Sequence, residues 1–158
     1  ILEKSDVMKV SEKEIDSRKL EFTNIANATF QAKGRDIHII DFGEASCLAL
    51  SKILSEKKIE NVIAVDERTT RLLGEKPENI KKIMGDKLHT NITSKKENYK
   101  FFQGFKFIRS SELIYVAYKN GFIEVKDGEI VLDALLYALM FSGCSISSAE
   151  IDEIKKMR

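Results

Sequence analysis

The chain has 158 residues, of which 43% are hydrophobic, and this suits one domain with a sizeable core rather than two. Its 26 Lys and Arg residues and 25 Asp and Glu residues give a net charge of only +1, so any RNA contact must come from local patches. No apolar run is long enough to span a membrane, and Cys47 and Cys144 have no metal or redox spacing. These features favour a cytoplasmic protein in reducing conditions, without a membrane partner.

The first part of the chain is predicted to alternate helix and strand. Residues 1–10 are interpreted as the end of a helix and a strand, with the strand at Val7–Val10. Ser17–Lys33 carries apolar residues among polar ones and predicts an amphipathic helix that ends near Gly34. A strand or extended segment is expected at Ile37–Ile40.

The next two elements each carry an acid. Gly43–Leu54 has apolar residues at mostly helical spacing, with Glu44 in its first turn. Asn61–Val65 is a nearly continuous apolar run, typical of a strand covered on both faces in a parallel sheet, and it stops at Asp66. Ligands bind beyond the carboxyl ends of strands in open α/β sheets, so Glu44 and Asp66 are expected to share the functional edge.

Both acids also have a plain structural interpretation. Asp41 and Glu44 have the spacing of a capping box, and the helix dipole favours a carboxylate in the first turn. Asp66 could likewise cap a helix that begins at Glu67. Helix caps are common, so spacing alone leaves cap and metal ligand open. On the same helix as Glu44, Cys47 is expected on the apolar face as a buried free thiol.

The second half of the chain continues the alternation of helices and strands. Helices are expected at Glu67–Leu73 and at Glu78–Met84, with Pro77 at a first turn, and a polar, irregular stretch at Asp86–Tyr99. The remaining elements are a strand at Phe105–Ile108, a helix at Ser110–Tyr118, a tight turn at Lys126–Gly128 and an apolar helix at Leu132–Phe141, for the core or an interface. This order predicts an α/β domain with parallel crossovers.

Polar residues near the strand ends are candidates for binding phosphate. Arg68 and Arg71 lie one turn apart, where they could contact phosphate or pair with neighbouring acids. Arg109, Ser110 and Ser111 directly follow a strand, so their hydroxyls and backbone N–H groups could hold a phosphate or simply begin a helix.

Aromatic residues stand among lysines in the segment 95–107. Such a set could form a base-stacking platform, although core and dimer packing are more frequent uses of phenylalanine. The aromatic residues are Tyr99, Phe101, Phe102, Phe105 and Phe107.

The stretches GEASCLALSK, VIAVDERTTRLLGE and FIRSSELIYVAYKNGFI resemble the central and C-terminal part of a PIN domain. They are most similar to the archaeal, VapC-related PIN-like ribonucleases, and the tail VLDALLYALMFSGCSIS is similar to the closing helix of such proteins. The resemblance implies a three-layer α/β domain in which helices flank a central parallel sheet. It also implies a metal-dependent endoribonuclease that acts on RNA, forms a homodimer and has an antitoxin-type protein partner.

Matched position by position, the resemblance makes Glu44 and Asp66 catalytic acids and metal ligands, with Glu67 beside them. The implied metal is Mg²⁺ or Mn²⁺, hard cations for which a site of Asp and Glu without His or Cys is suitable. One or two such ions can supply the attacking hydroxide and stabilise the leaving oxygen of a phosphodiester. The expected RNA-binding residues are Arg68, Arg71, Arg109, Ser110 and Ser111.

The chain also departs from the family pattern, which needs an Asp after the first strand and usually a Glu in an early helix. Neither is visible, so residues 1–158 are expected to form a single PIN-like domain whose N-terminal strand and early helices lie upstream or on another fragment. A rearranged or degenerate site is the rival explanation. Its possible substitutes, Asp6, Glu12, Glu14 and Asp16, fit a solvated helix start more simply.

Two other functions stay open. The first is a PIN-like RNA-binding or scaffold domain without catalysis. The second is a receiver- or nucleotide-binding-type α/β domain that uses Asp66 as an isolated acid. That hypothesis predicts a glycine-rich phosphate loop or an acidic pair elsewhere, and the sequence has neither.

Overall fold

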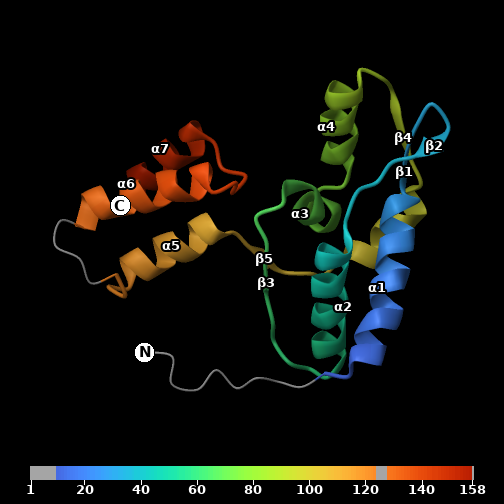
Figure 1. The fold of residues 1–158 in the computed structure, drawn as a ribbon, viewed down its shortest axis with the longest axis horizontal. Helices are drawn as coiled ribbons and strands as arrows, with labels where there is room; N and C mark the ends of the chain where they lie inside the picture. Colours follow the sequence, from blue (N-terminus) through green and yellow to red (C-terminus); the bar gives the residue numbers. More distant parts are fainter. Residues whose placement is uncertain (1–9, 124–127, 158) are drawn as a thin grey trace.

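Helices alternate with short strands along the chain in a computed structural model, which describes residues 10–123 and 128–157 (Figure 1). The first elements are α1 (Glu12–Asn27), β1 (Phe30–Ala32), β2 (Arg35–Asp36), α2 (Phe42–Glu56), β3 (Ile63–Ala64), α3 (Arg68–Glu75) and α4 (Glu78–Leu88). They are followed by β4 (Ile92–Ser94), the 3-10 helix η1 (Lys96–Phe102), β5 (Phe107–Ile108), α5 (Ser110–Lys119), α6 (Gly128–Phe141) and α7 (Ser148–Lys156).

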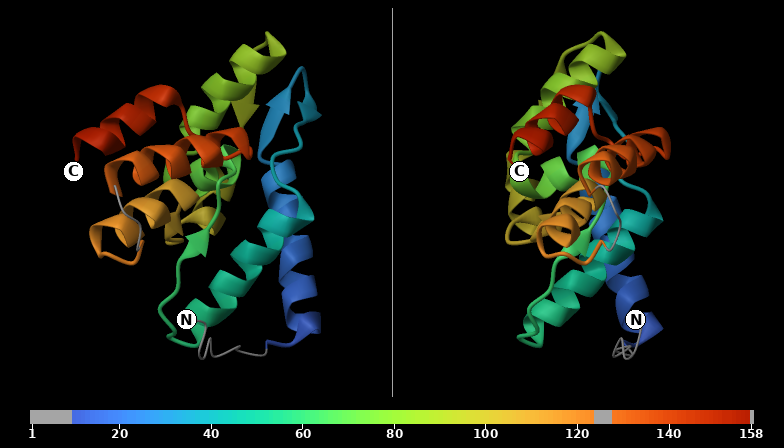
Figure 2. Two further views of the ribbon diagram at one scale, coloured as in Figure 1. Left: turned by 60° about the vertical axis from the view of Figure 1, so that its left-hand side comes forward. Right: turned by 90° about the vertical axis from the view of Figure 1, so that its left-hand side faces the viewer.

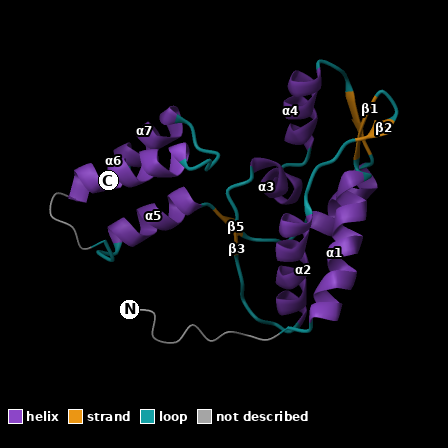
Figure 3. Ribbon diagram, viewed as in Figure 1, coloured by secondary structure: helices purple, strands orange, loops and turns teal. Residues whose placement is uncertain are grey.

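Two small sheets, orange in Figure 3, are formed by the described residues. β3 and β5 pair in parallel, with Ile63 opposite Phe107 and Ala64 opposite Ile108. The other sheet is antiparallel, in the order β2-β1-β4. The predicted α/β class is therefore confirmed. The parallel sheet has only two strands, so the three-layer PIN-like arrangement with a central parallel sheet is not confirmed.

The first helix lies earlier in the chain than predicted. α1 ends at Asn27, whereas the sequence pattern placed the helix over Ser17–Lys33. Phe30, part of that predicted helix, lies in β1, where it is fully buried opposite Ser94 of β4. Pairing with β4, which lies more than 60 residues further along the chain, therefore outweighs the helical periodicity of the local sequence. The strand predicted at Val7–Val10 lies outside the described residues, apart from its last position, which belongs to no strand.

The segment Ile37–Ile40 is extended but belongs to no sheet. The Oδ1 atom of Asn27 accepts the backbone N–H groups of Ile39 and Ile40, at 2.6 and 3.1 Å. These bonds satisfy donors that a neighbouring strand would otherwise bind. They hold two buried isoleucines in place immediately before α2.

Most other predicted elements are present with shifted ends. The helices predicted at Gly43–Leu54, Glu67–Leu73, Glu78–Met84 and Ser110–Tyr118 are α2, α3, α4 and α5, and the predicted strands at Asn61–Val65 and Phe105–Ile108 contain β3 and β5. Asp86–Tyr99 is not irregular, because it holds the end of α4, β4 and part of η1. The predicted turn at Lys126–Gly128 lies largely outside the described residues. Helix α7 was not predicted.

The buried apolar side chains form two clusters. The larger cluster contains Leu48 of α2 and Phe102 of η1, and it fills the space among α1, α2, α3, α4 and the small sheets. The second contains Leu136 of α6 and Ile151 of α7, with α5 packed against them. β3 lies between α2 and α5 in Figures 1 and 2, so the parallel strands stand where the two clusters meet.

Gly74 lets α3 pack closely on β5. A Cβ atom at this position would lie 2.6 Å from Cε2 of Phe107 and 3.1 Å from the carbonyl oxygen of Phe102. We expect Gly74→Ala to lower the free energy of unfolding by up to about 2 kcal/mol, because overpacking costs about 1–3 kcal/mol and the gain in helix propensity offsets only about 1 kcal/mol of it. Urea denaturation measures this change. Gly43→Ala in α2, where nothing lies within 4 Å, is the matched control; equal stability of the two variants would contradict the close packing.

Candidate functional site

Asp66 follows β3 and is held by the start of α5. Its Oδ1 atom accepts the backbone N–H of Ser110 at 2.8 Å, and its Oδ2 atom accepts the Ser110 hydroxyl at 2.7 Å. Burial opposes the charged form, but these two hydrogen bonds, together with the Cys144 thiol and the charge of Arg109, hold the pKa of Asp66 below its usual value. Asp66 is therefore an ionised carboxylate in a fixed position at the carboxyl end of the parallel pair.

Glu67, and not Asp66, is the N-cap of α3. The two carboxylate oxygens of Glu67 accept the backbone N–H groups of Thr69 and Thr70, at 2.8 and 2.5 Å. Both oxygens thus satisfy helix donors that would otherwise lack an acceptor. This structural role accounts for Glu67, which the family resemblance had placed among the metal ligands.

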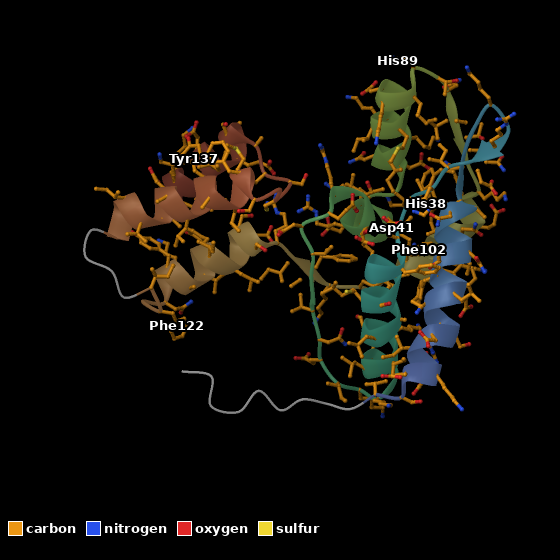
Figure 4. All side chains as sticks on the ribbon, viewed as in Figure 1. His38, Asp41, His89, Phe102, Phe122 and Tyr137 are labelled. Atoms are coloured by element: carbon orange, nitrogen blue, oxygen red, sulfur yellow. The ribbon has the colours of Figure 1, made fainter. Side chains whose placement is uncertain are left out.

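Glu44 lies in the first turn of α2, and its Oε2 atom is buried without a hydrogen-bond partner among the described residues. The capping box predicted with Asp41 is not formed, because the side chain of Asp41 makes no cap bond. Its Oδ1 atom instead lies 2.7 Å from Nε2 of His38, and Figure 4 shows both side chains near the start of α2. A buried carboxylate oxygen without a donor is costly, and a bound cation would remove that cost.

The start of α2, which carries Glu44, and the end of β3, which precedes Asp66, lie towards the same side, near α3 (Figure 1). In Figures 1 and 2, α2 begins at the end towards which β3 runs. Within residues 10–123 and 128–157, however, no group of three or more His, Cys, Asp or Glu side chains could hold a metal ion. The described residues therefore supply two candidate carboxylates and not a complete cluster.

The substitutes suggested for the missing acids lie elsewhere. Glu12, Glu14 and Asp16 belong to the start of α1. That end of α1 contacts the end of α2, where Arg18 pairs with Glu56 at 2.7 Å. Because Glu44 and Glu56 are separated by about 18 Å of helix, these acids cannot join the Glu44 site. The fourth substitute, Asp6, is outside the described residues.

Arg109 connects α5 to α7. Its Nη1 atom lies 2.7 Å from Oε1 of Glu150, and its Nε atom lies 3.1 Å from Oε1 of Glu112. Glu150 also accepts the N–H and the hydroxyl of Ser147, each at 2.9 Å. Burial opposes the charge, but these bonds lower the pKa of Glu150 to about 2. Arg109, predicted to bind RNA, therefore uses its guanidinium within the protein.

Ser110 and Ser111, also predicted to bind RNA, have no free donors for a phosphate at the surface. The N–H and hydroxyl of Ser110 are both bound to Asp66. Ser111 is fully buried, and its hydroxyl has no partner among the described residues. The start of α5 thus holds a carboxylate of the protein itself.

Arg68 and Arg71 remain available for an anion. Arg71 lies 3.9 Å from Glu75, a weak contact, and the exposed Arg68 side chain makes no hydrogen bond or ion pair within the described parts of the chain. The two arginines line one cavity of about 470 Å³ between α3 and the connection from α6 to α7. The other lining residues are Ser145, Ile146, Ser147 and Glu150.

The cavity includes residues that were not predicted as functional. Ser147 and Glu150 form a capping box at the start of α7, in which the Ser147 hydroxyl accepts the N–H of Glu150 at 3.2 Å. The S-x-x-E spacing is a recognised signal for a helix start, so α7 and these two residues could have been found from the sequence.

The two cysteines differ in environment, and both are free. Cys144 is buried, and burial together with the charge of Asp66 raises its pKa to about 11, so it remains an unreactive thiol. Cys47, predicted to be buried, is exposed. The face of α2 that points into the core carries Ala45, Leu48 and Ala49, and Cys47 lies outside that row.

The aromatic residues mainly build the core. Phe102 is fully buried, and the ring of Phe22 lies 5.9 Å from that of Phe102 and 5.8 Å from that of Phe105. Tyr99 stacks on Phe30, with ring centroids 6.0 Å apart. Core packing, the more frequent use of phenylalanine, therefore explains these rings, whereas Phe101 is 41% exposed with Lys100 over its ring.

Comparison of the chain with protein-family models, with curated proteins and with solved structures gives no match. Among the described residues, no helix has the length and apolar character needed to cross a membrane. The two carboxylates and the arginine-lined cavity are therefore the features of the described residues that bear on function.

Proposed function

We propose that the protein is a PIN-like ribonuclease in which Glu44 and Asp66 hold a Mg²⁺ or Mn²⁺ ion for the hydrolysis of RNA. The observation that supports this most is the position of Asp66, fixed by Ser110 at the carboxyl end of a parallel strand. The buried Oε2 atom of Glu44, which has no hydrogen-bond partner among the described residues, is the proposed second ligand. The sequence resemblance to PIN proteins selects the same two acids.

Glu44 and Asp66 have the type of ligand atom, a carboxylate oxygen, that a hard divalent cation prefers. Both are carboxylates, and each oxygen of Asp66 keeps further acceptor capacity beside its bond from Ser110. A bound ion would activate water and stabilise the leaving oxygen. Asp66 and Glu44 would orient that ion, whereas Arg68 and Arg71 would hold RNA phosphate nearby. Because two ligands leave most positions to water, a further carboxylate is proposed to complete the site.

The proposed source of that carboxylate is a further strand beside β3, as a three-layer PIN-like domain requires. The N–H groups of Ile63 and Val65 bond to β5, at 2.9 and 3.0 Å, so the backbone groups of Val62 and Ala64 face the opposite edge. An apolar cavity of about 160 Å³ lies along this edge, between β3 and α2. An extended apolar segment suits such an edge, and its carboxyl end would lie next to Asp66 if the pairing is parallel.

Metal-dependent RNA cleavage tests this function. The product of the complete reading frame is incubated with structured and single-stranded RNA in Mg²⁺, Mn²⁺ or EDTA. We expect cleavage with either metal and none in EDTA. Glu44→Gln and Asp66→Asn should each lower the rate about 10²- to 10³-fold, the usual loss when a group that stabilises the transition state is removed.

An exposed acid away from the site provides the control. Glu60→Gln removes one negative charge near the start of β3 and should leave the rate unchanged. Equal cleavage in EDTA, or full activity of both Glu44→Gln and Asp66→Asn, would rule out the proposed ribonuclease.

A second candidate is a PIN-like domain that binds RNA without cutting it. The absence of a group of three metal-binding side chains from residues 10–123 and 128–157 favours it. In that case fluorescence anisotropy should show equal RNA affinity in EDTA and in Mg²⁺. Glu44→Gln should then leave the affinity unchanged.

The partners implied by the resemblance are RNA, a second copy of the chain and an antitoxin-type protein, in the cytoplasm. Exposed apolar side chains on the C-terminal helices support a protein interface there. Leu113 and Val116 of α5 are 44% and 48% exposed, and Phe141 of α6 is 82% exposed. Light scattering of the purified protein would distinguish a homodimer from a monomer.

A further inference from the structure

We propose that the cavity between α3 and the connection from α6 to α7 binds a terminal phosphate of the RNA. This inference rests on the proposed function, because it specifies which part of an RNA substrate the protein recognises. The cavity has a volume of about 470 Å³, and all but one of its lining residues are polar or charged. The exception is Ile146, which is buried.

The positive charges at the cavity are not matched by free negative ones. The carboxylate of Glu150 is already bound by Arg109 and Ser147, at 2.7 and 2.9 Å. The 3.9 Å separation of Arg71 from Glu75 is far longer than a charge-assisted hydrogen bond of about 2.7–2.9 Å. Together with Arg68, Arg71 therefore presents a guanidinium that an anion can bind.

A phosphate monoester suits this pair better than the linkages within an RNA chain. A monoester carries about −1.5 to −2 charges at neutral pH, whereas an internal diester carries one. Each guanidinium group can donate two parallel hydrogen bonds to phosphate oxygens. Arg68 and Arg71 together can therefore neutralise the two negative charges of a monoester. Ser145, which makes no side-chain hydrogen bond within the described residues, adds a hydroxyl donor on the opposite wall.

The arginines that line the cavity are close along the chain to the proposed metal ligand. Arg68 follows Asp66 by two residues, and Arg109, which holds Glu150 in the cavity wall, precedes the residue that holds Asp66. A phosphate bound by Arg68 would therefore place one end of the RNA beside the site of hydrolysis. The protein would favour RNA ends over internal positions.

Binding of short single-stranded RNA tests the inference. RNAs with a phosphate at the 5′ end, at the 3′ end or at neither end are compared by fluorescence anisotropy in EDTA, with inorganic phosphate as competitor. We expect one phosphorylated RNA to bind about tenfold tighter than the unphosphorylated RNA. The double variant Arg68→Gln/Arg71→Gln should lose this preference and the competition by phosphate.

A matched double variant controls for the loss of two positive charges. Lys33→Gln/Arg35→Gln removes exposed cations from the region of β1 and β2, far along the chain from the cavity, and should keep the preference. If phosphorylated and unphosphorylated ends bind alike, or if Arg68→Gln/Arg71→Gln keeps the preference, the terminal-phosphate site is wrong while RNA binding stands. If inorganic phosphate binds and no RNA does, the proposed function fails and the RNA inference with it.

Discussion

Asp66→Ala should lower the free energy of unfolding by about 2–4 kcal/mol, because it removes two hydrogen bonds to a charged acceptor. The N–H and hydroxyl of Ser110 would both lose their partner at a part-buried position. Asp66 follows a strand of the larger apolar cluster, and Ser110 begins a helix of the second. Hydrogen exchange in α5, α6 and α7 should therefore rise more than in α1 and α2. Urea denaturation gives the overall loss.

Two variants separate the structural role of Asp66 from its proposed role in catalysis. Asp66→Asn keeps an oxygen to accept the Ser110 N–H, so it should retain most of the stability while it loses the charge. In a double-mutant cycle, Asp66→Ala and Ser110→Ala should be strongly non-additive, since they share one contact. Additive effects, or an Asp66→Ala variant as stable as the native protein, would contradict the fixed position of this carboxylate.

The local pattern predicted the parts of the site that depend on neighbouring residues. The apolar run before Asp66 identified the end of a strand, but not its burial: Ile63 is buried, whereas Val62 is 53% exposed and Ala64 is exposed, so the expected cover on both faces is wrong. The one-turn spacing of Arg68 and Arg71 placed both on the same side of a helix. The structure brings these arginines to one cavity. Such features follow from short-range periodicity, which a single sequence contains.

The parts that could not be predicted depend on contacts between distant segments. Ser110 binds Asp66 across 44 positions, and Arg109 binds Glu150 across 41. Because of these contacts, Arg109 and Ser110, which were expected to bind phosphate, instead bind carboxylates of the protein itself. Phe30 likewise adopts a strand because β4 pairs with it. No spacing rule reveals which distant donor a given carboxylate will meet.

Glu44→Gln should distinguish a metal ligand from a helix cap. As a first-turn acid, Glu44 would stabilise α2 through the helix dipole, and the neutral variant would lose about 0.3–1 kcal/mol. Its buried Oε2 atom has no hydrogen-bond partner among the described residues, so the substitution breaks no hydrogen bond of that atom. We therefore expect the variant to be at least as stable as the native protein in metal-free buffer. A clear loss of stability would favour the cap.

The most direct test of the proposed metal pair is the binding of Mn²⁺, measured by electron paramagnetic resonance on the product of the complete reading frame. We expect Glu44→Gln and Asp66→Asn each to weaken binding at least about tenfold, because each removes a charged oxygen ligand from the same ion. Glu60→Gln should bind Mn²⁺ as the native protein does. Unchanged Mn²⁺ affinity in both Glu44→Gln and Asp66→Asn would show that these carboxylates do not hold a metal.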